Sequence, residues 1–410
     1  MKTLLIIGHT FPEPTTTAAG TRMMQIISLF LEQEYKITFA CTALLSEKSE
    51  VLSNYGINSI AIKLNDESFN EFIEDLNPSI VMFDRFITEE QFGWRVAEQC
   101  PKALRILDTE DLHFLRKARQ EAVKIQNNTN EVNLLTETAK REIASIYRCD
   151  LSLIISEVEM EILQDTFKVD SSILHYLPFL VEKNLEKTSF PKFEERNHFI
   201  TIGNLLHKPN VDSVLFLKKE IWPEIRKLLP NAELHIYGAY APQQISELHN
   251  KKQGFLIKGW TPSVSEVMRN ARVCLAPLRF GAGLKGKFIE AFKNETPSVT
   301  TKIGAEGISG NLSFAGRIAD NKEDIIKASL ELYREKDKWL IAQKKASEIL
   351  NRRFDRKLFS KKFENQVIFI QKNLVEHRNK NFIGQILQTQ SLLSIKYMSM
   401  WIEEKNKHII

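Results

Sequence analysis

Short apolar segments alternate with amphipathic ones along most of this 410-residue chain. Thr3–Gly8 and Ile80–Phe83 are apolar runs typical of strands that are buried on both faces, whereas Arg22–Gln33 carries its apolar residues at helical spacing. When strands alternate with helices, each helix returns the chain across the sheet, so the strands run parallel. The first half of the chain therefore predicts a doubly wound α/β lobe.

The same alternation starts again after a polar linker at residues 181–197. Phe199–Gly203 reads as a strand, and Asn210–Leu229 reads as the helix that follows it. A chain of this length is too long for a single core. We expect two doubly wound lobes, one over residues 1–185 and one over residues 198–350.

The amino-acid composition excludes several classes of function. The contents of hydrophobic residues (43%) and charged residues (26%) are those of a soluble globular protein. A net charge of +4 is small for this length and gives no case for a nucleic-acid partner. The four cysteines are scattered without a C-x-x-C pair, so neither a zinc site nor a disulfide framework is indicated. The apolar run Leu4–Ile7 is too short for a signal peptide, and we expect a cytoplasmic protein.

The segment Val273–Ile308 carries the strongest functional pattern. Val273–Ala276 reads as a strand, and a glycine-rich loop with three cations follows it; these residues are Arg279, Gly281, Gly283, Lys285, Gly286 and Lys287. Glycines let backbone N–H groups approach a ligand, and lysine and arginine pair with phosphate. The loop enters the helix Phe288–Lys293, whose N-terminus favours an anion.

Two carboxylates are expected at the same edge of the predicted sheet as the glycine-rich loop. Glu290 lies in that helix, and Glu306 follows the next strand, Pro297–Thr301. Ligands of open α/β sheets bind at the carboxyl ends of the strands. The combination of cations, free N–H groups and carboxylates suits a phosphorylated sugar nucleotide, although Glu306 in a Glu-Gly pair also suits a plain turn.

The stretch AP-LR-GAG-KGK-IEAF…TPSVTTKIGAEG resembles the nucleotide-sugar signature of the family 4, or group 1, glycosyltransferases. The resemblance is strongest over Phe199–Ile308 and implies the GT-B fold, in which two Rossmann-like lobes face a central cleft. It further implies transfer of a sugar, with retention, from a nucleotide diphosphate sugar (a UDP- or GDP-sugar) to an acceptor hydroxyl. The acceptor would be a sugar or a lipid-linked glycan, the setting polysaccharide or glycolipid assembly, and no cofactor or metal would be required.

The resemblance assigns the phosphate contacts to the second lobe. Lys208 fits one member of the family's cation pair, and Asn204, next to Gly203, stands where an arginine is common. Arg279, Lys285 or Lys287 would then supply the missing cation. Among these, Lys208 and Lys285 are the expected catalytic cations.

The family often has two glutamates around the glycine-rich loop. Glu290 matches the second, which the resemblance assigns to the ribose hydroxyls, but Ala282 occupies the place of the first. Backbone N–H groups of Gly281–Leu284 are the candidates to replace its sugar contact. Gly238 resembles the family glycine that lets the nucleotide approach, and Trp260 either stacks near the base or belongs to the core.

The first lobe should hold the acceptor. Gly20 and Arg22 follow the first strand, where the resemblance places a loop facing the donor phosphates; Arg22 would otherwise be exposed or cap a helix. Asp108 and His113 follow the strand ending at Leu107, and either of them would orient the acceptor hydroxyl or accept its proton. The alternative for Asp108 is a helix cap. Glu110 lies between them and is a weaker candidate for the same role.

The C-terminal region offers two further expectations. The GT-B resemblance makes 351–375 a helix that crosses back to the first lobe, with 376–410 as a tail. Residues Phe382–Ile402 are apolar with one charge, so this stretch either packs on the protein's own surface or contacts the inner face of a membrane peripherally. The unusual residues Asn204 and Ala282 also leave open a catalytically inactive GT-B module that acts as a partner subunit. A phosphorylase or epimerase with the same fold is a further rival.

Overall fold

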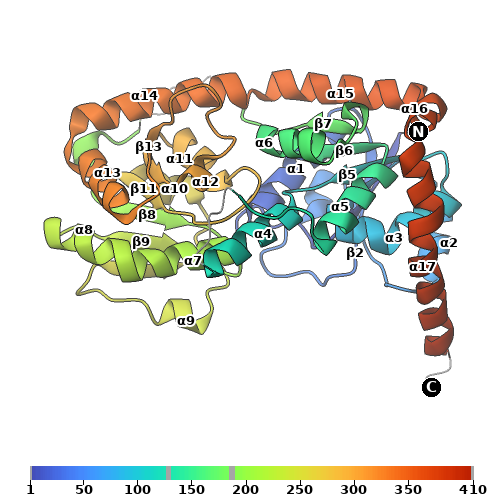
Figure 1. Ribbon diagram of the computed structural model, residues 1–410, viewed down its shortest axis with the longest axis horizontal. Coiled ribbons are helices and arrows are strands. Elements are labelled where there is room, and N and C mark those ends of the chain that lie inside the picture. Colours follow the sequence, from blue (N-terminus) through green and yellow to red (C-terminus); the bar gives the residue numbers. More distant parts are fainter. Residues whose placement is uncertain (1, 126–130, 184–189, 408–410) are drawn as a thin grey trace.

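The computed structural model describes residues 2–125, 131–183 and 190–407. Within these ranges the chain forms two parallel sheets that lie side by side along the long axis of the molecule (Figure 1). The seven-stranded sheet has the order β3-β2-β1-β4-β5-β6-β7, and the six-stranded sheet has the order β10-β9-β8-β11-β12-β13. The middle of the predicted linker lies outside the described residues.

The first lobe is doubly wound, as its sequence pattern predicts. Its strands are β1 (Thr3–Gly8), β2 (Lys36–Cys41), β3 (Asn58–Ala61), β4 (Ile80–Asp84), β5 (Leu104–Asp108), β6 (Leu151–Ile154) and β7 (Leu174–Tyr176). Its helices are α1 (Ala18–Leu31), α2 (Ser68–Leu76), α3 (Arg85–Gln99), α4 (His113–Lys124), α5 (Glu137–Arg148) and α6 (Glu157–Glu161). β1 pairs in parallel with both β2 and β4, so the strand order reverses there and opens a crevice at the carboxyl ends.

The second lobe repeats this plan. Its strands are β8 (Phe199–Ile202), β9 (Leu234–Tyr237), β10 (Phe255–Gly259), β11 (Val273–Ala276), β12 (Ser298–Thr300) and β13 (Gly316–Ile318). Its helices are α7 (Lys208–Phe216), α8 (Trp222–Leu228), α9 (Gln243–Ser246), α10 (Val264–Asn270), α11 (Gly286–Lys293), α12 (Lys302–Ala305), α13 (Lys322–Arg334) and α14 (Lys336–Arg353). The reversal lies between β8 and β11, which places the glycine-rich loop after β11 at the crevice of this sheet.

A helix near the C-terminus completes the core of the first lobe. After α14 the chain turns at Phe354, and α15 (Arg356–Lys372) runs along the first lobe, at the top of Figure 1. Phe359, Phe363, Val367 and Ile370 of α15 are buried in the same hydrophobic cluster as residues of β1 and α1. The first lobe therefore depends on residues that lie beyond the second lobe in the sequence.

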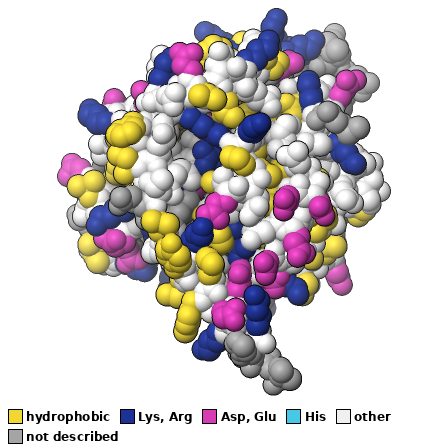
Figure 2. Space-filling view, turned by 90° about the vertical axis from the view of Figure 1, so that its right-hand side faces the viewer, with side chains coloured by type: hydrophobic (Ala, Val, Ile, Leu, Met, Phe, Trp, Pro, Cys, Tyr) yellow, Lys and Arg dark blue, Asp and Glu magenta, His cyan; other side chains and the backbone are white. Residues whose placement is uncertain are grey.

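The tail forms α16 (Leu374–Lys380) and α17 (Phe382–Lys407). Arg378 binds the buried carboxylate of Asp150 through two bonds of 2.8 Å, and α17 packs against α3 and α5. The structure thus shows a helix packed on the protein's own surface, which is one of the two alternatives for Phe382–Ile402, and peripheral contact with a membrane stays a prediction. Figure 2 looks at the end of the molecule that carries α17, where hydrophobic side chains gather beside charged ones. No helix among the described residues is long and apolar enough to cross a bilayer.

Replacing Phe363 by alanine should destabilise the protein by about 3 kcal/mol, because a fully buried aromatic ring is lost from the first-lobe core. Urea unfolding measures this change. Phe369→Ala is the matched control, since Phe369 lies on the same helix with 60% of its surface exposed, and it should leave the unfolding midpoint almost unchanged. Equal effects of the two substitutions would contradict the packing of α15.

Candidate active site

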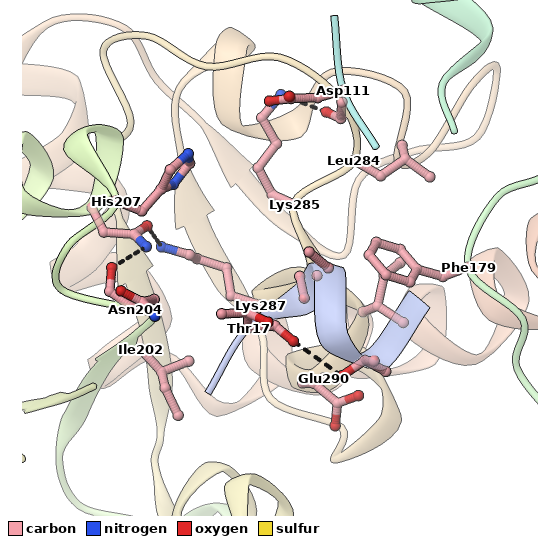
Figure 3. A pocket seen from close by; sticks show the side chains of 18 of the residues that line it. Thr17, Asp111, Phe179, Ile202, Asn204, His207, Leu284, Lys285, Lys287 and Glu290 are labelled. Carbon is pink, nitrogen blue, oxygen red and sulfur yellow. Dashed lines mark hydrogen bonds between the residues drawn. The ribbon is translucent and has the colours of Figure 1, made fainter. Parts of the chain in front are cut away.

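A cleft of about 380 Å³ lies between the two lobes, at the carboxyl ends of both sheets. Loops after β1, β4 and β5 line it from the first lobe, and loops after β8, β9, β10 and β11 line it from the second. Predicted site residues in the lining are His113, Gly203, Asn204, Gly238, Trp260, Gly281, Gly283, Leu284, Lys285, Lys287 and Glu290. Figure 3 shows several of these side chains around the cavity.

The glycine-rich loop lies against the first lobe. Gly283 has a φ of +61°, and a Cβ there would come within 2.9 Å of the Asp111 Cβ. A Cβ on Gly286 would come within 2.8 Å of the Ala18 Cβ. Glycine is required at both positions, because only a bare backbone allows this close approach.

The start of α11 presents an anion-binding surface to the cleft. Lys285 occupies the N-cap position without a side-chain cap, and the first residues Gly286 and Lys287 line the cleft. Uncapped N–H groups and the helix dipole favour a negative ligand. Glu290 lines the cleft about one turn further along α11 and pairs with Lys293 at 2.9 Å.

The two lysines of the loop have different partners. Lys287 Nζ donates to Asn210 Oδ1 at 2.7 Å, and Asn210 Nδ2 donates to the Asn204 carbonyl at 2.9 Å (Figure 3). Lys285 Nζ donates to the Gly283 carbonyl at 2.8 Å. Burial lowers the pKa of both ammonium groups, that of Lys287 to about 8. Lys285 forms only a long ion pair with Glu306, at 3.8 Å, and no carboxylate among the described residues pairs with Lys287. Both cations would therefore be better stabilised by a bound anion.

The first lobe contributes a cluster of charged groups opposite this loop. Arg85 and Glu110 line the cleft directly after β4 and β5, and both adopt left-handed backbone conformations, with φ of 69° and 62°. Strained residues of this kind concentrate at functional sites. Burial raises the pKa of Glu110 to about 8, and the nearby Asp108 carboxylate adds to the effect, so Glu110 is mainly neutral at pH 7.

His113 lines the same side of the cleft, with its Nε2 atom 3.4 Å from Asp111 Oδ1. Burial lowers the pKa of His113 to about 3 despite this carboxylate, so the imidazole is uncharged at neutral pH. Burial alone would raise the pKa of Asp111, but Arg116 and His113 hold it below its ordinary value. An uncharged imidazole in this position can accept a hydrogen bond from a hydroxyl, whereas its lowered pKa disfavours taking up the proton.

Two contacts tie the glycine-rich loop to the first lobe. Arg119 of α4 binds both carboxylate oxygens of Glu306, at 2.7 and 2.8 Å, and also the Gly281 carbonyl at 2.9 Å. Glu159 Oε1 accepts from the backbone N–H groups of Gly283 and Leu112, each at 2.8 Å. Both side chains are buried, so these bonds fix how the lobes meet.

Two further contacts cross the mouth of the cleft. The Tyr240 hydroxyl lies 3.0 Å from both carboxylate oxygens of Glu13. Lys48 Nζ lies 3.5 Å from the centre of the Trp260 ring. Trp260 is 37% exposed, so the alternative that places it in the core is wrong, and its ring remains a candidate to stack on a base.

The structure does not bring Arg22 and Asp108 to the cleft. The Arg22 guanidinium binds the Asp108 carboxylate, with Nη2 2.9 Å from Oδ1, and the Leu177 carbonyl. Both side chains are buried and neither lines the cavity. The predicted contact of Arg22 with phosphate and the predicted acceptor role of Asp108 are therefore wrong, because the two groups satisfy each other inside the first lobe.

Gly20 and Lys208 also lie outside the lining. A Cβ on Gly20 would come within 2.4 Å of the Glu13 backbone, so this glycine lets the loop after β1 fold back over α1. Lys208 is exposed at the start of α7, whereas its neighbours His207 and Asn210 line the cleft. Successive residues of a helix point in different directions, which turns Lys208 away.

Two other residues that the sequence predicts to bind the donor instead bind other residues of the protein. Arg279 is exposed outside the cleft and binds the Asp212 carboxylate at 2.5 and 2.9 Å. Glu306 is held by Arg119, as described above. Glu306 is thus a contact between the lobes, and the prediction that it binds the donor is wrong.

Several residues that shape the site are not predicted, or only weakly predicted, by the sequence: Arg85, Glu110, Asp111, Arg119, Glu159 and Asn210. Glu159 follows Ser156 in an S-x-x-E pattern that reads as a capping box. No signal in the sequence indicates that it instead reaches Gly283 in the other lobe. Glu110 and Arg85 do directly follow strands, which is the available signal for a site residue. Among the described residues, no group of three or more His, Cys, Asp or Glu side chains is placed to hold a metal ion.

Residues 196–335 match the family model described as "Glycosyl transferases group 1". No curated protein matches the sequence.

Several solved structures share the fold at low sequence identity. A point mutant of S. aureus TarM, in complex with fondaparinux, α-GlcNAc-glycerol and UDP, has a TM-score of 0.68 and 11% identity, over 89% of this chain and 99% of that one. The pneumococcal O-GlcNAc transferase GtfA, in complex with UDP and GlcNAc, has a TM-score of 0.66 and 12% identity, over 90% and 99%. Anabaena HepE, in complex with UDP and glucose, has a TM-score of 0.65 and 11% identity, over 90% and 99%.

The structural likeness shows the fold, and the family model covers the lobe that carries the glycine-rich loop. The second lobe thus matches the group 1 glycosyltransferase family model, and the whole chain has the two-lobed GT-B fold of these solved structures.

Proposed function

We propose that this protein transfers a sugar, with retention, from a nucleotide diphosphate sugar to a hydroxyl of a sugar or lipid-linked glycan acceptor. The observation that carries the proposal is the placement of Lys285, Lys287 and the uncapped start of α11 in one cleft between the lobes. UDP is the favoured donor nucleotide over GDP, because UDP is bound in the solved relatives TarM, GtfA and HepE. Polysaccharide or glycolipid assembly is the proposed setting.

The chemistry follows from the charges in the cleft. As the bond between the anomeric carbon and the β-phosphate oxygen breaks, negative charge grows on the departing diphosphate. Lys285, Lys287 and the α11 N-terminus, which all line the cleft, stabilise that charge. Glu290 accepts hydrogen bonds from the ribose, and Trp260 supplies an aromatic surface at the rim for the base.

The first lobe positions the acceptor. The acceptor oxygen forms the new bond to the anomeric carbon, and its proton passes to the departing phosphate while the uncharged His113 accepts a hydrogen bond from the acceptor. Glu110 and Arg85 lie beside His113 in the lining and supply hydrogen bonds to acceptor hydroxyls. Glu110 acts there as a neutral donor and acceptor, because its pKa is about 8.

The two unusual motif residues have structural substitutes. Lys287 is bonded to Asn210, whose amide is in turn bonded to Asn204, so a cation lies beside the position of the missing arginine. Ala282 packs into the hydrophobic cluster of the first lobe and fits between the lobes where a carboxylate would be poorly solvated. These substitutes favour an active enzyme over an inactive partner subunit. Slow hydrolysis of the donor sugar in the absence of acceptor separates the two, because an inactive module would release no nucleotide.

Lys287→Ala should weaken UDP binding by about 10- to 100-fold, since one charge-assisted hydrogen bond is worth about 1.5–3 kcal/mol. Isothermal titration calorimetry measures the affinity. Lys302→Ala is the control, because Lys302 is exposed on α12 and pairs with Asp320 outside the cleft. Unchanged UDP affinity in both Lys287→Ala and Lys285→Ala would show that the nucleotide site is elsewhere.

UDP affinity should fall as the pH rises through about 8. The Lys287 ammonium is charged below its lowered pKa and neutral above it, so the attraction to phosphate is present at pH 7 and lost at higher pH. Calorimetry between about pH 7 and 9.5 follows the change, within the range in which phosphate is already ionised. Lys287→Arg should flatten the profile because arginine stays charged, and any fall that remains would report Lys285. A flat wild-type profile would contradict the role of Lys287.

His113→Ala should lower the rate of donor hydrolysis by about 100-fold while leaving UDP affinity within about twofold, because the imidazole contacts the acceptor side and not the nucleotide. Glu110→Gln is the matched comparison and should keep most of the rate at pH 7, since the amide resembles a neutral carboxyl group. A rate unaffected by His113→Ala would remove His113 from the catalytic machinery.

A further inference from the structure

The start of helix α7 forms part of the cleft wall next to the start of α11. His207, Pro209 and Asn210 line the cleft there, whereas Lys208 lies outside the lining. Asn210 Oδ1 accepts the 2.7 Å hydrogen bond from Lys287 Nζ, so the first turn of α7 is bonded to the first turn of α11. The two helix starts therefore border the same part of the cavity.

The His207 side chain lines the cleft without a protein partner. The backbone around it is fixed, because its N–H donates to the Asn204 carbonyl at 3.2 Å and its carbonyl accepts from Asn210 and Val211 at 2.9 and 3.2 Å. The imidazole does not cap α7, and no group among the described residues forms a hydrogen bond with it. A polar ring that is held in a cleft wall without a partner is available to a ligand.

The ring lies close to the cations of the glycine-rich loop. His207 and Asn210 are three positions apart in the first turn of α7, so their side chains are on the same face of the helix. Figure 3 shows the His207 ring at the edge of the cavity near the end of the Lys287 side chain, and the charge of Lys287 acts on the ring. An anion bound at Lys287 would therefore also be near His207.

The charges around the ring favour an anion. The guanidinium groups of Arg116 and Arg85 contribute positive potential at the ring, in addition to Lys287. Asp111 contributes negative charge, but Arg116 binds both of its carboxylate oxygens. The ring is open to solvent in the cleft but surrounded by both lobes, and this burial lowers the pKa of His207 to about 4. The imidazole is thus uncharged at pH 7 and carries one N–H donor.

The order of the strands indicates which part of a nucleotide His207 can reach. Strand β8, which precedes His207, lies between β9 and β11 in the sheet, whereas Trp260, the candidate to stack on the base, follows β10 at its edge. On its other side, His207 is near enough to Asp111 and Arg116 of the first lobe for their charges to act on it. His207 therefore lies between the expected base and the acceptor lobe, where a diphosphate would lie.

The charge of a diphosphate exceeds that of the two lysines of the loop. A terminal phosphate carries up to about two negative charges near pH 7, and the phosphate that links it to the nucleoside adds to this. Asn204, at the position where an arginine is common, is uncharged, and Lys208 lies outside the cleft lining. We propose that His207 donates its ring N–H to the terminal phosphate of the bound nucleoside diphosphate and helps to hold the leaving group, an inference that rests on the proposed function.

Isothermal titration calorimetry of the full chain with UDP and UMP tests this contact. His207→Ala should weaken UDP binding by about tenfold and change UMP binding by less than about twofold, because UMP lacks the terminal phosphate. Lys208→Ala is the matched control, since the neighbouring side chain lies outside the lining, and it should leave both affinities within about twofold. The melting temperature of His207→Ala without ligand should equal that of the wild type, because the ring has no hydrogen bond to lose.

Phosphorus NMR of bound UDP gives a second readout. His207→Ala should shift the resonance of the terminal phosphate and leave that of the other phosphate nearly unchanged, which a merely structural role would not do. Wild-type affinity for UDP in His207→Ala, or an equal loss with UMP, would overturn the contact. A loss with UDP-glucose but not with UDP would assign His207 to the sugar and would also overturn it. Wild type that binds no UDP would instead contradict the proposed function itself.

Discussion

The bonds from Glu159 to the Gly283 amide and from Arg119 to the Gly281 carbonyl and Glu306 hold the glycine-rich loop against the first lobe. The cleft depends on this contact, because one of its walls comes from each lobe. Among the described residues, no carboxylate pairs with Lys287, and Lys285 has only a long ion pair with Glu306, yet the loop backbone is held at both Gly281 and Gly283. A held backbone with two under-compensated cations is a preorganised site for a polyvalent anion.

The two lobes line the cleft with groups of different charge. The second lobe supplies positive charge from Lys285, Lys287 and a helix start, and the first lobe supplies uncharged or neutralised groups such as His113 and Glu110. Burial produces both conditions, since it lowers the pKa of the lysines and the histidine and raises that of the glutamate. In the reaction proposed above, the positive charge of the second lobe would stabilise the leaving diphosphate, and the uncharged groups of the first lobe would bind the acceptor hydroxyl.

Much of the fold, and the position of the glycine-rich loop in the cleft, could be predicted from the sequence. Strand and helix periods define both sheets, and glycines and lysines directly after β11 must lie at the carboxyl edge of a parallel sheet. The acceptor side could not be predicted in the same way. Whether Arg22 faces a ligand or Asp108 depends on how α1 packs on β5, which residue spacing does not define. The pairing of Glu306 with Arg119 likewise joins two lobes whose relative position the sequence pattern does not contain. Lys208 points away from the cleft, whereas the neighbouring positions of α7 line it. A shift of one residue in the helix start changes which side chain faces the cleft, and helix starts are predicted with a larger error than that.

The most direct test of the central claim, that the cleft binds a nucleotide diphosphate sugar, is a thermal-shift screen of the full chain against UDP-, GDP-, ADP- and dTDP-sugars. A ligand that binds only the folded protein raises its melting temperature in proportion to its affinity and concentration. The structure predicts a concentration-dependent rise with a UDP-sugar that is largely lost in Lys287→Ala. No shift with any of the four, or an equal shift in Lys287→Ala, would contradict the assignment of the glycine-rich loop as the donor site.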